Sequence, residues 1–182
     1  MTSTLKGALM ALGGFALFST HDAVVKVLGG SYSPFQILFF SVLFGFPLVF
    51  VMLIGDASAG TLRPVHLRLT LLRTVLGVTV ALSAFTAFSI LPLAQVYAII
   101  FAQPLLITAL SVPVLSERVG PTRWAAIAIG LAGVLIVLRP GAAPLGIGHL
   151  AALVASVGGA GVAVILRKIG QEERSAVLIV FP

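Results

Sequence analysis

The sequence has no cysteine and few charged residues. The absence of cysteine among its 182 residues excludes disulfide bonds and cysteine-ligated metal sites. Its histidines, His21, His66 and His149, are scattered without the spacing of metal ligands, so we expect no metal and no other cofactor. No glycine-rich nucleotide-binding loop occurs, which argues against ATP-driven chemistry in this chain.

Low charge is accompanied by a large excess of apolar residues. Charged residues make up 9% of the chain and hydrophobic residues 59%, whereas a soluble domain has about 25% charged residues. A soluble fold of this length could not bury so much apolar surface, so the remainder must face lipid. The apolar runs are continuous rather than alternating, which favours helices over the strands of a membrane barrel. The composition predicts an all-α, polytopic helical membrane protein.

Turn-forming residues divide the chain into six apolar segments. Each has about the 17–25 residues that a helix needs to cross a bilayer. Pro92 separates the third segment from the fourth, because one helix of their combined length would far exceed the membrane. The predicted spans are Leu5–Leu28, Pro34–Ile54, Leu69–Leu91, Leu93–Leu115, Pro121–Leu138 and Ile147–Ile169.

The distribution of Lys and Arg predicts how these spans are oriented. With the N-terminus inside, nine of the eleven basic residues fall at cytoplasmic ends or loops, the exceptions being Lys26 and Arg139. We therefore expect a multi-pass protein of the cell (inner) membrane with a cytoplasmic N-terminus. The net charge of +6 is distributed among these gaps rather than on one face, so nucleic acid is not an expected partner.

The sixth span repeats part of the first. Gly7, Leu9, Ala11 and Leu12 match Gly148, Leu150, Ala152 and Leu153, and Lys26 then aligns with Arg167. Because five spans form one unit, a second copy would enter the membrane from the opposite side, as in inverted-repeat transporters. A self-sufficient six-span protein is the alternative.

Several motifs resemble those of the EamA-type transporters of the drug/metabolite transporter superfamily. The most specific is Leu115-Ser-Glu-Arg118 followed by Trp124 and Gly130-Leu-Ala-Gly-Val-Leu-Ile-Val-Leu-Arg-Pro-Gly141. Further segments are Phe18-Ser-Thr-His-Asp-Ala-Val-Val-Lys26, Ser33-Pro-Phe-Gln-Ile-Leu-Phe-Phe40, Leu91-Pro-Leu-Ala-Gln-Val96 and Gln103-Pro104. The arrangement of Asp22 and Lys26 is most similar to that in the subgroup that includes S-adenosylmethionine carriers.

This resemblance implies ten helices in two inverted five-helix repeats with a substrate cavity between them. Residues 1–140 would form the first repeat, and residues 141–182 the beginning of the second, with helix six and the start of helix seven. The chain would then be truncated after its sixth helix. It departs from the family pattern at Ser41, where related sequences often carry arginine.

Two ionisable residues of the first span are candidates for coupling or gating. Asp22 and Lys26 are four residues apart, so they share a helix face and can pair. Ionisable groups within the membrane are costly and tend to be functional. The structural alternative is a snorkelling lysine with its carboxylate partner at the helix end. For His21 we expect an interfacial position rather than a role in proton transfer.

The third and fourth spans supply candidate substrate-binding residues. Neutral polar groups beside aromatic rings suit a cavity that holds an uncharged or zwitterionic molecule. Pro104, a further gating candidate, frees the carbonyl of Ile100, and a broken helix is best tolerated beside a cavity. Hydrogen bonding between helices is the alternative, favoured for the threonine and serine. The candidates are Gln103, Tyr97, Gln95, Phe101, Thr79 and Ser83.

Glycines recur within the predicted spans. Gly13-Gly14, Gly130 with Gly133, and Gly158-Gly159 with Gly161 are expected to let helices approach closely.

Together these features predict a secondary transporter that moves small organic metabolites, amino acids or related polar metabolites, by alternating access. The expected partners are the small-molecule substrate, the lipid bilayer and either a second copy or the missing half of the repeat. Two alternatives stay open. A membrane-embedded lipid-modifying enzyme would need clustered ionisable groups, and His21, Asp22 and Lys26 are sparse for that purpose. A non-transporting assembly subunit is the other.

Overall fold

The chain folds as a bundle of helices. The structure, a computed structural model, describes residues 3–55, 62–117, 119–138 and 145–181. Arg118, Arg139 and the boundary proposed at residues 140/141 lie outside the described residues. The described residues contain helices and no strand, which confirms the all-α class. The helices are α1 (Ser3–Leu28), α2 (Pro34–Gly55), α3 (Leu67–Ile90), α4 (Leu93–Ile100), α5 (Gln103–Leu115), α6 (Pro121–Leu138), α7 (Ile147–Ile169) and α8 (Ser175–Val180).

Five segments of the described chain are long and apolar enough to cross a membrane. They are α1, α2, α3, the α4–α5 segment and α7, and the candidate span in each is 22 to 25 residues long. The predicted span Pro121–Leu138 corresponds to α6, which is a shorter apolar helix. The break at Pro92 is confirmed, because α3 ends at Ile90 and α4 begins at Leu93.

The fourth predicted span is interrupted and is not one continuous helix. α4 ends at Ile100 and α5 begins at Gln103, with a turn at Phe101 and Ala102. Pro104 lies in the first turn of α5, a position where its missing N–H leaves no helical hydrogen bond unmade. The carbonyl of Ile100 loses the donor that a continuous helix would provide, which explains the interruption.

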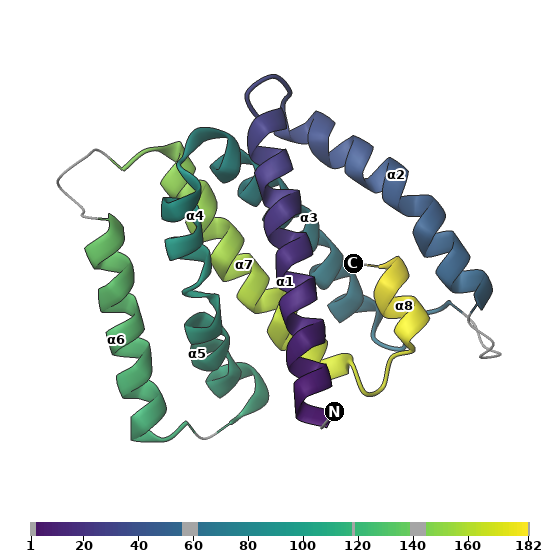
Figure 1. Cartoon of the computed structure of the whole chain (residues 1–182). Helices are drawn as coiled ribbons and strands as arrows, with labels where there is room; N and C mark the ends of the chain where they lie inside the picture. Colours follow the sequence, from purple (N-terminus) through teal and green to yellow (C-terminus); the bar gives the residue numbers. More distant parts are fainter. Residues whose placement is uncertain (1–2, 56–61, 118, 139–144, 182) are drawn as a thin grey trace.

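Successive long helices run in alternating directions across the bundle (Figure 1). α1 rises from the N-terminus at the bottom of the view, whereas α7 descends from the top and ends near the bottom. The two segments that share a sequence pattern, α1 and α7, therefore run antiparallel, the relationship that an inverted repeat requires.

The most extensive contact between two helices of the bundle is that between α3 and α7. α7 is the most buried long helix, and small residues such as Ala152, Ala155 and Ala160 form its packed face. A side chain at Gly158 would place Cβ 2.7 Å from Cγ2 of Val80 on α3, and one at Gly161 would lie 3.3 Å from Leu76. These contacts confirm that glycines of α7 allow a close helix approach.

The other glycine pairs differ from this pattern. Gly130 contacts Leu105 closely, which confirms its packing role. A Cβ at Gly13, Gly14 or Gly133 would meet nothing within 4 Å among the described residues, so the predicted close approach is not made there.

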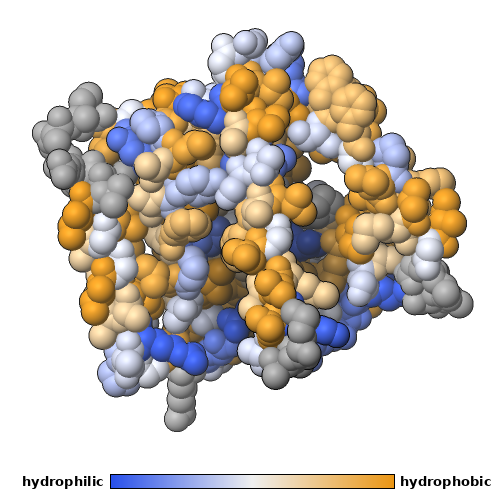
Figure 2. All heavy atoms as spheres, viewed as in Figure 1, coloured by the Kyte–Doolittle hydropathy of each residue, from blue (hydrophilic) through white to orange (hydrophobic). Residues whose placement is uncertain are grey.

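Apolar side chains cover much of the molecular surface. Phe15, Phe44 and Ile54 of α1 and α2 are each about 70% exposed, at 69%, 72% and 71%. Figure 2 shows hydrophobic atoms over much of the visible face and strongly hydrophilic residues along its lower rim. A surface of this kind needs a lipid environment, as expected for a multi-pass membrane protein.

α8 is held against α3 by a buried arginine. Arg73, 8% exposed, donates hydrogen bonds from Nη1 to the carbonyls of Phe181 at 2.6 Å and Leu178 at 3.2 Å. The residue four positions after Leu178 is Pro182, which has no N–H to offer a helical carbonyl. The arginine thus satisfies a carbonyl that the sequence leaves without its helical donor.

Candidate functional site

Two of the candidate residues are joined by a hydrogen bond between α1 and α4. The Tyr97 hydroxyl donates to Oδ2 of Asp22 at 3.0 Å, and Nδ1 of His21 lies 3.1 Å from the other carboxylate oxygen. The Asp22 side chain is 17% exposed, so neighbouring side chains cover most of its carboxylate. A coupling candidate and a substrate-binding candidate therefore belong to one polar cluster.

Aromatic rings surround this cluster. Tyr97 stacks on Phe101 with ring centroids 5.5 Å apart and meets Phe88 edge-on at 6.1 Å. The His21 ring lies 5.8 Å from Phe85. We refer to His21, Asp22, Phe85, Phe88, Tyr97 and Phe101 as the Asp22–Tyr97 cluster. Phe101, at the helix break, is 67% exposed, so one ring of the cluster lies at the surface.

Lys26 binds the end of a neighbouring helix rather than Asp22. Its ammonium donates to the carbonyl of Leu91 at 2.8 Å and lies 3.4 Å from the carbonyl of Ser89. The last carbonyls of a helix lack intrahelical donors and attract positive charge, so Lys26 caps α3. No ion pair between Lys26 and Asp22 occurs in the part of the chain that the structure describes. Their predicted pairing is therefore wrong in this structure.

Close approach between α1 and α3 makes this cap possible. A side chain at Gly29 would place Cβ 2.5 Å from Cβ of Ser89, so only glycine fits. Gly29 thereby brings Lys26 within reach of the end of α3.

Gln103 lies against α7. A Cβ added at Gly159 would be 3.0 Å from Cδ, Nε2 and Oε1 of Gln103, so the amide packs flat on the glycine. Gln95 is half-buried on α4. No hydrogen bond among the described residues joins Gln95 or Gln103 to the Asp22–Tyr97 cluster.

The hydroxyls of α3 bond to their own helix. Thr79 donates to the carbonyl of Val75 at 2.8 Å, and Thr86 donates to Leu82 at 2.7 Å. Thr79 is exposed and Ser83 is half-buried. For Thr79 we favoured a hydrogen bond between helices, but its hydroxyl bonds within α3 instead. Neither Thr79 nor Ser83 contacts Asp22 or Tyr97 through a described hydrogen bond.

A second polar cluster was not anticipated from the sequence. Glu173, 6% exposed, accepts a hydrogen bond from the backbone N–H of His66 at 2.7 Å, and Glu172 lies 2.6 Å from Nε2 of His66. Glu173 thereby caps the N-terminus of α3 from the α7–α8 connection. The signal in the sequence was an acidic pair in a chain with five acidic residues.

Neither cluster resembles a metal site. Among the residues that the structure describes, no group of three His, Cys, Asp or Glu side chains could hold a metal ion. What the Asp22–Tyr97 cluster offers is a carboxylate beside aromatic faces, which suits recognition of an organic cation.

The sequence is similar to those of known membrane transporters. It is 31% identical over 147 residues to the S-adenosylmethionine uptake transporter of Rickettsia conorii, covering 77% of this chain and 49% of the relative. The protein of the same name from Rickettsia bellii is 32% identical over the same length and shares. The riboflavin transporter of Rhizobium johnstonii is 34% identical over 97 residues, covering 53% of this chain and 31% of the relative.

These relatives are longer than the chain. It spans about half the length of the S-adenosylmethionine uptake transporters that it matches. No solved structure matches. The EamA-like transporter family matches residues 5–139, which extend from the first turn of α1 to the end of α6 and include every residue of the Asp22–Tyr97 cluster. The chain therefore belongs to the EamA-like transporter family, within the drug/metabolite transporter superfamily.

Proposed function

We propose that the chain forms part of a secondary transporter that moves small organic metabolites, amino acids or related polar metabolites, by alternating access. Family membership favours a transporter over an enzyme. The observation that carries the proposal is the hydrogen bond between Asp22 and Tyr97 at a junction of three helices. Ionisable groups held inside a helical bundle commonly mark a substrate or ion pathway in membrane proteins.

The chemistry of the cluster supports a substrate with a positive group. Asp22 supplies a negative charge, and the faces of Tyr97 and Phe101 attract cations. An α-amino group meets both requirements. S-adenosylmethionine, the compound in the names of several relatives, combines an amino-acid group with a sulfonium cation and a planar base. It is therefore the first probe to test.

The helix break gives the proposed site a place to change shape. The turn at Phe101 and Ala102 separates α4 from α5, and Phe101 stacks directly on Tyr97. We propose Pro104 as the gating residue that keeps this turn open. Thr79, Ser83, Gln95 and Gln103 are proposed to line the substrate path outside the cluster.

We propose that α7 and α8 are the beginning of a second inverted repeat, which would supply the second half of the transport unit. A second copy of the chain is the alternative source of that half. Residues 1–140 would be the first repeat. We propose that the N-terminus is cytoplasmic in a cell (inner) membrane, because the basic residues gather at that end of the bundle.

Flux into proteoliposomes tests this function. Amino acids, S-adenosylmethionine, riboflavin and nucleosides are offered at imposed pH gradients, with protein-free liposomes as the blank. We expect saturable uptake of one class, and a loss of about tenfold or more in Asp22→Asn, since a charged interaction contributes about 1.5–3 kcal/mol.

The matched control is Glu117→Gln, which removes an acidic residue just after the end of α5 and is expected to leave flux unchanged. Unchanged flux in Asp22→Asn would remove this carboxylate from the mechanism. Absence of flux for every compound, with the chain folded, would contradict a transport unit built from copies of this chain alone.

A further inference from the structure

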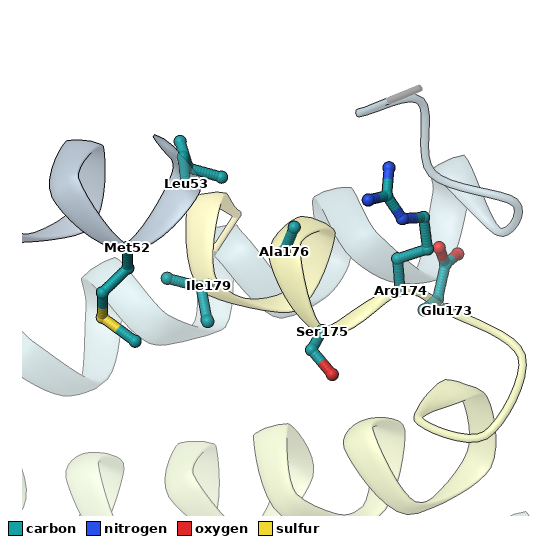
Figure 3. A pocket seen from close by; sticks show the side chains of 7 residues that line it. All are labelled: Met52, Leu53, Glu173, Arg174, Ser175, Ala176 and Ile179. Atoms are coloured by element: carbon teal, nitrogen blue, oxygen red, sulfur yellow. The ribbon is translucent and has the colours of Figure 1, made fainter. Parts of the chain in front are cut away.

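A cavity of about 410 Å³ lies between the end of α2 and the start of α8. Figure 3 shows that its two ends differ in chemistry, with charged side chains at one end and apolar side chains at the other. The charged end has Glu173 and Arg174, and the apolar end has Met52, Leu53 and Ile179. The cavity is therefore amphipathic, and it is separate from the Asp22–Tyr97 cluster.

The carboxylate of Glu173 is only half satisfied. Oε1 accepts the backbone N–H of His66, whereas Oε2 is buried and has no hydrogen-bond partner in the part of the chain that the structure describes. A buried carboxylate oxygen without a donor is costly. A cationic donor that enters from the cavity would remove that cost.

Arg174 adds the opposite charge to the same wall. An acidic and a basic side chain side by side favour a zwitterion, whose ammonium can face the glutamate while its anionic group faces the arginine. A purely anionic or purely cationic ligand would be attracted by one of these residues and repelled by the other.

The apolar end shows where such a ligand comes from. Met52 is 58% exposed and Ile179 is 38% exposed, on helices whose surroundings in a bilayer are lipid chains. The charged end lies at the start of α3, next to the helix ends where basic residues gather, which is the level of lipid headgroups. A ligand with a zwitterionic head and apolar chains matches both ends of the cavity.

We propose that this cavity binds an ethanolamine phospholipid. The ammonium donates to Glu173, the phosphate binds Arg174, and the first acyl carbons lie along Met52, Leu53 and Ile179. Binding would hold α2 against α8 from outside the proposed transport site.

Native mass spectrometry of the purified chain with single lipids tests this assignment. Phosphatidylethanolamine is compared with phosphatidylcholine, whose ammonium has no N–H, and with phosphatidylglycerol, which has no ammonium. We expect phosphatidylethanolamine to bind about tenfold more tightly than either, since the distinguishing contact is a charge-assisted hydrogen bond. Equal affinity for the three lipids would overturn the proposal.

The neighbouring glutamate provides a matched control. Glu173→Gln should abolish the preference for ethanolamine. Glu172→Gln removes the same charge from a side chain that is 64% exposed, and should keep the preference. A preference that persists in Glu173→Gln would refute the role of this carboxylate.

A third measurement needs no substitution and therefore does not depend on the folding of a variant. Phosphatidylethanolamine with a photoreactive acyl chain should label peptides that contain Met52 or Ile179. Excess soluble glycerophosphoethanolamine should compete poorly, because it lacks the acyl chains. Labelling confined to other helices would contradict a lipid at this cavity, and full competition by the soluble compound would show a site for free zwitterions instead.

Discussion

The ammonium of Lys26 lies 2.8 Å from the carbonyl oxygen of Leu91, so the last turn of α1 holds the end of α3. This contact assigns Lys26 a structural role, because the carbonyls at a helix end need donors from elsewhere. It also fixes the position of Asp22, one helical turn earlier on α1.

Removing this cap should destabilise the protein. Lys26→Met keeps the length of the side chain but leaves the Leu91 carbonyl without its donor, at an expected cost of about 1–3 kcal/mol. Thermal unfolding in detergent measures the loss. Lys6→Met, at an exposed position near the N-terminus, is the control and should unfold like the parent. Equal unfolding of the two variants would show that the cap contributes nothing.

Gly158 of α7 should tolerate alanine far less than Gly133 of α6 does. Gly158→Ala places Cβ 2.7 Å from Cγ2 of Val80, a stiff side chain, and should cost about 1–3 kcal/mol. Gly133→Ala meets nothing within 4 Å among the described residues and should be neutral or slightly stabilising. Thermal unfolding in the same detergent compares them. A Gly158→Ala variant as stable as Gly133→Ala would contradict the α3–α7 packing.

Arg73 should control the order of α8. Arg73→Met removes the donors to the Leu178 and Phe181 carbonyls, so the amides of α8 should exchange hydrogen about tenfold faster, as expected for the loss of about 1.4 kcal/mol. Hydrogen–deuterium exchange of the peptide spanning 175–181 measures this.

Arg68→Met, on the exposed part of the same helix, serves as the control. Exchange in α8 that is identical in the two variants would show that Arg73 does not hold this helix in place.

The fold class and the positions of most spans could be predicted from the sequence. A proline interrupts a helix at its own position, and a long apolar run marks a span without information from other parts of the chain. Pro92 separates α3 from α4 as expected. Pro104 pointed to a freed carbonyl, but the span was still drawn as one helix, since sequence alone does not show whether a proline bends a helix or divides it.

The candidate site was harder to predict, because partners in different helices have no sequence signal. Asp22 and Lys26 have helical spacing, yet each bonds to a group at least 63 residues away, Asp22 to Tyr97 and Lys26 to α3. Gln95 and Gln103 belong to one predicted span, but the interruption places them on separate helices, α4 and α5. Glu173 could not be linked to His66 without the tertiary structure.

The cluster itself makes a further prediction about stability. Tyr97→Phe deletes the hydroxyl that binds Asp22 while keeping the stacking on Phe101, so the loss should be small, about 0.5–2 kcal/mol. Tyr32→Phe, at a ring that is 54% exposed, is the control in thermal unfolding and should show no loss. A larger loss of stability in Tyr32→Phe than in Tyr97→Phe would contradict a stabilising hydrogen bond between Tyr97 and Asp22.

The most direct test of the central claim is a double-mutant cycle on the binding of radiolabelled S-adenosylmethionine to the purified chain. If Asp22 and Tyr97 form one substrate site, Asp22→Asn and Tyr97→Phe should each weaken binding, and the double variant should bind hardly more weakly than Asp22→Asn alone. Affinity that is unchanged in both single variants, or losses that simply add, would contradict a shared site.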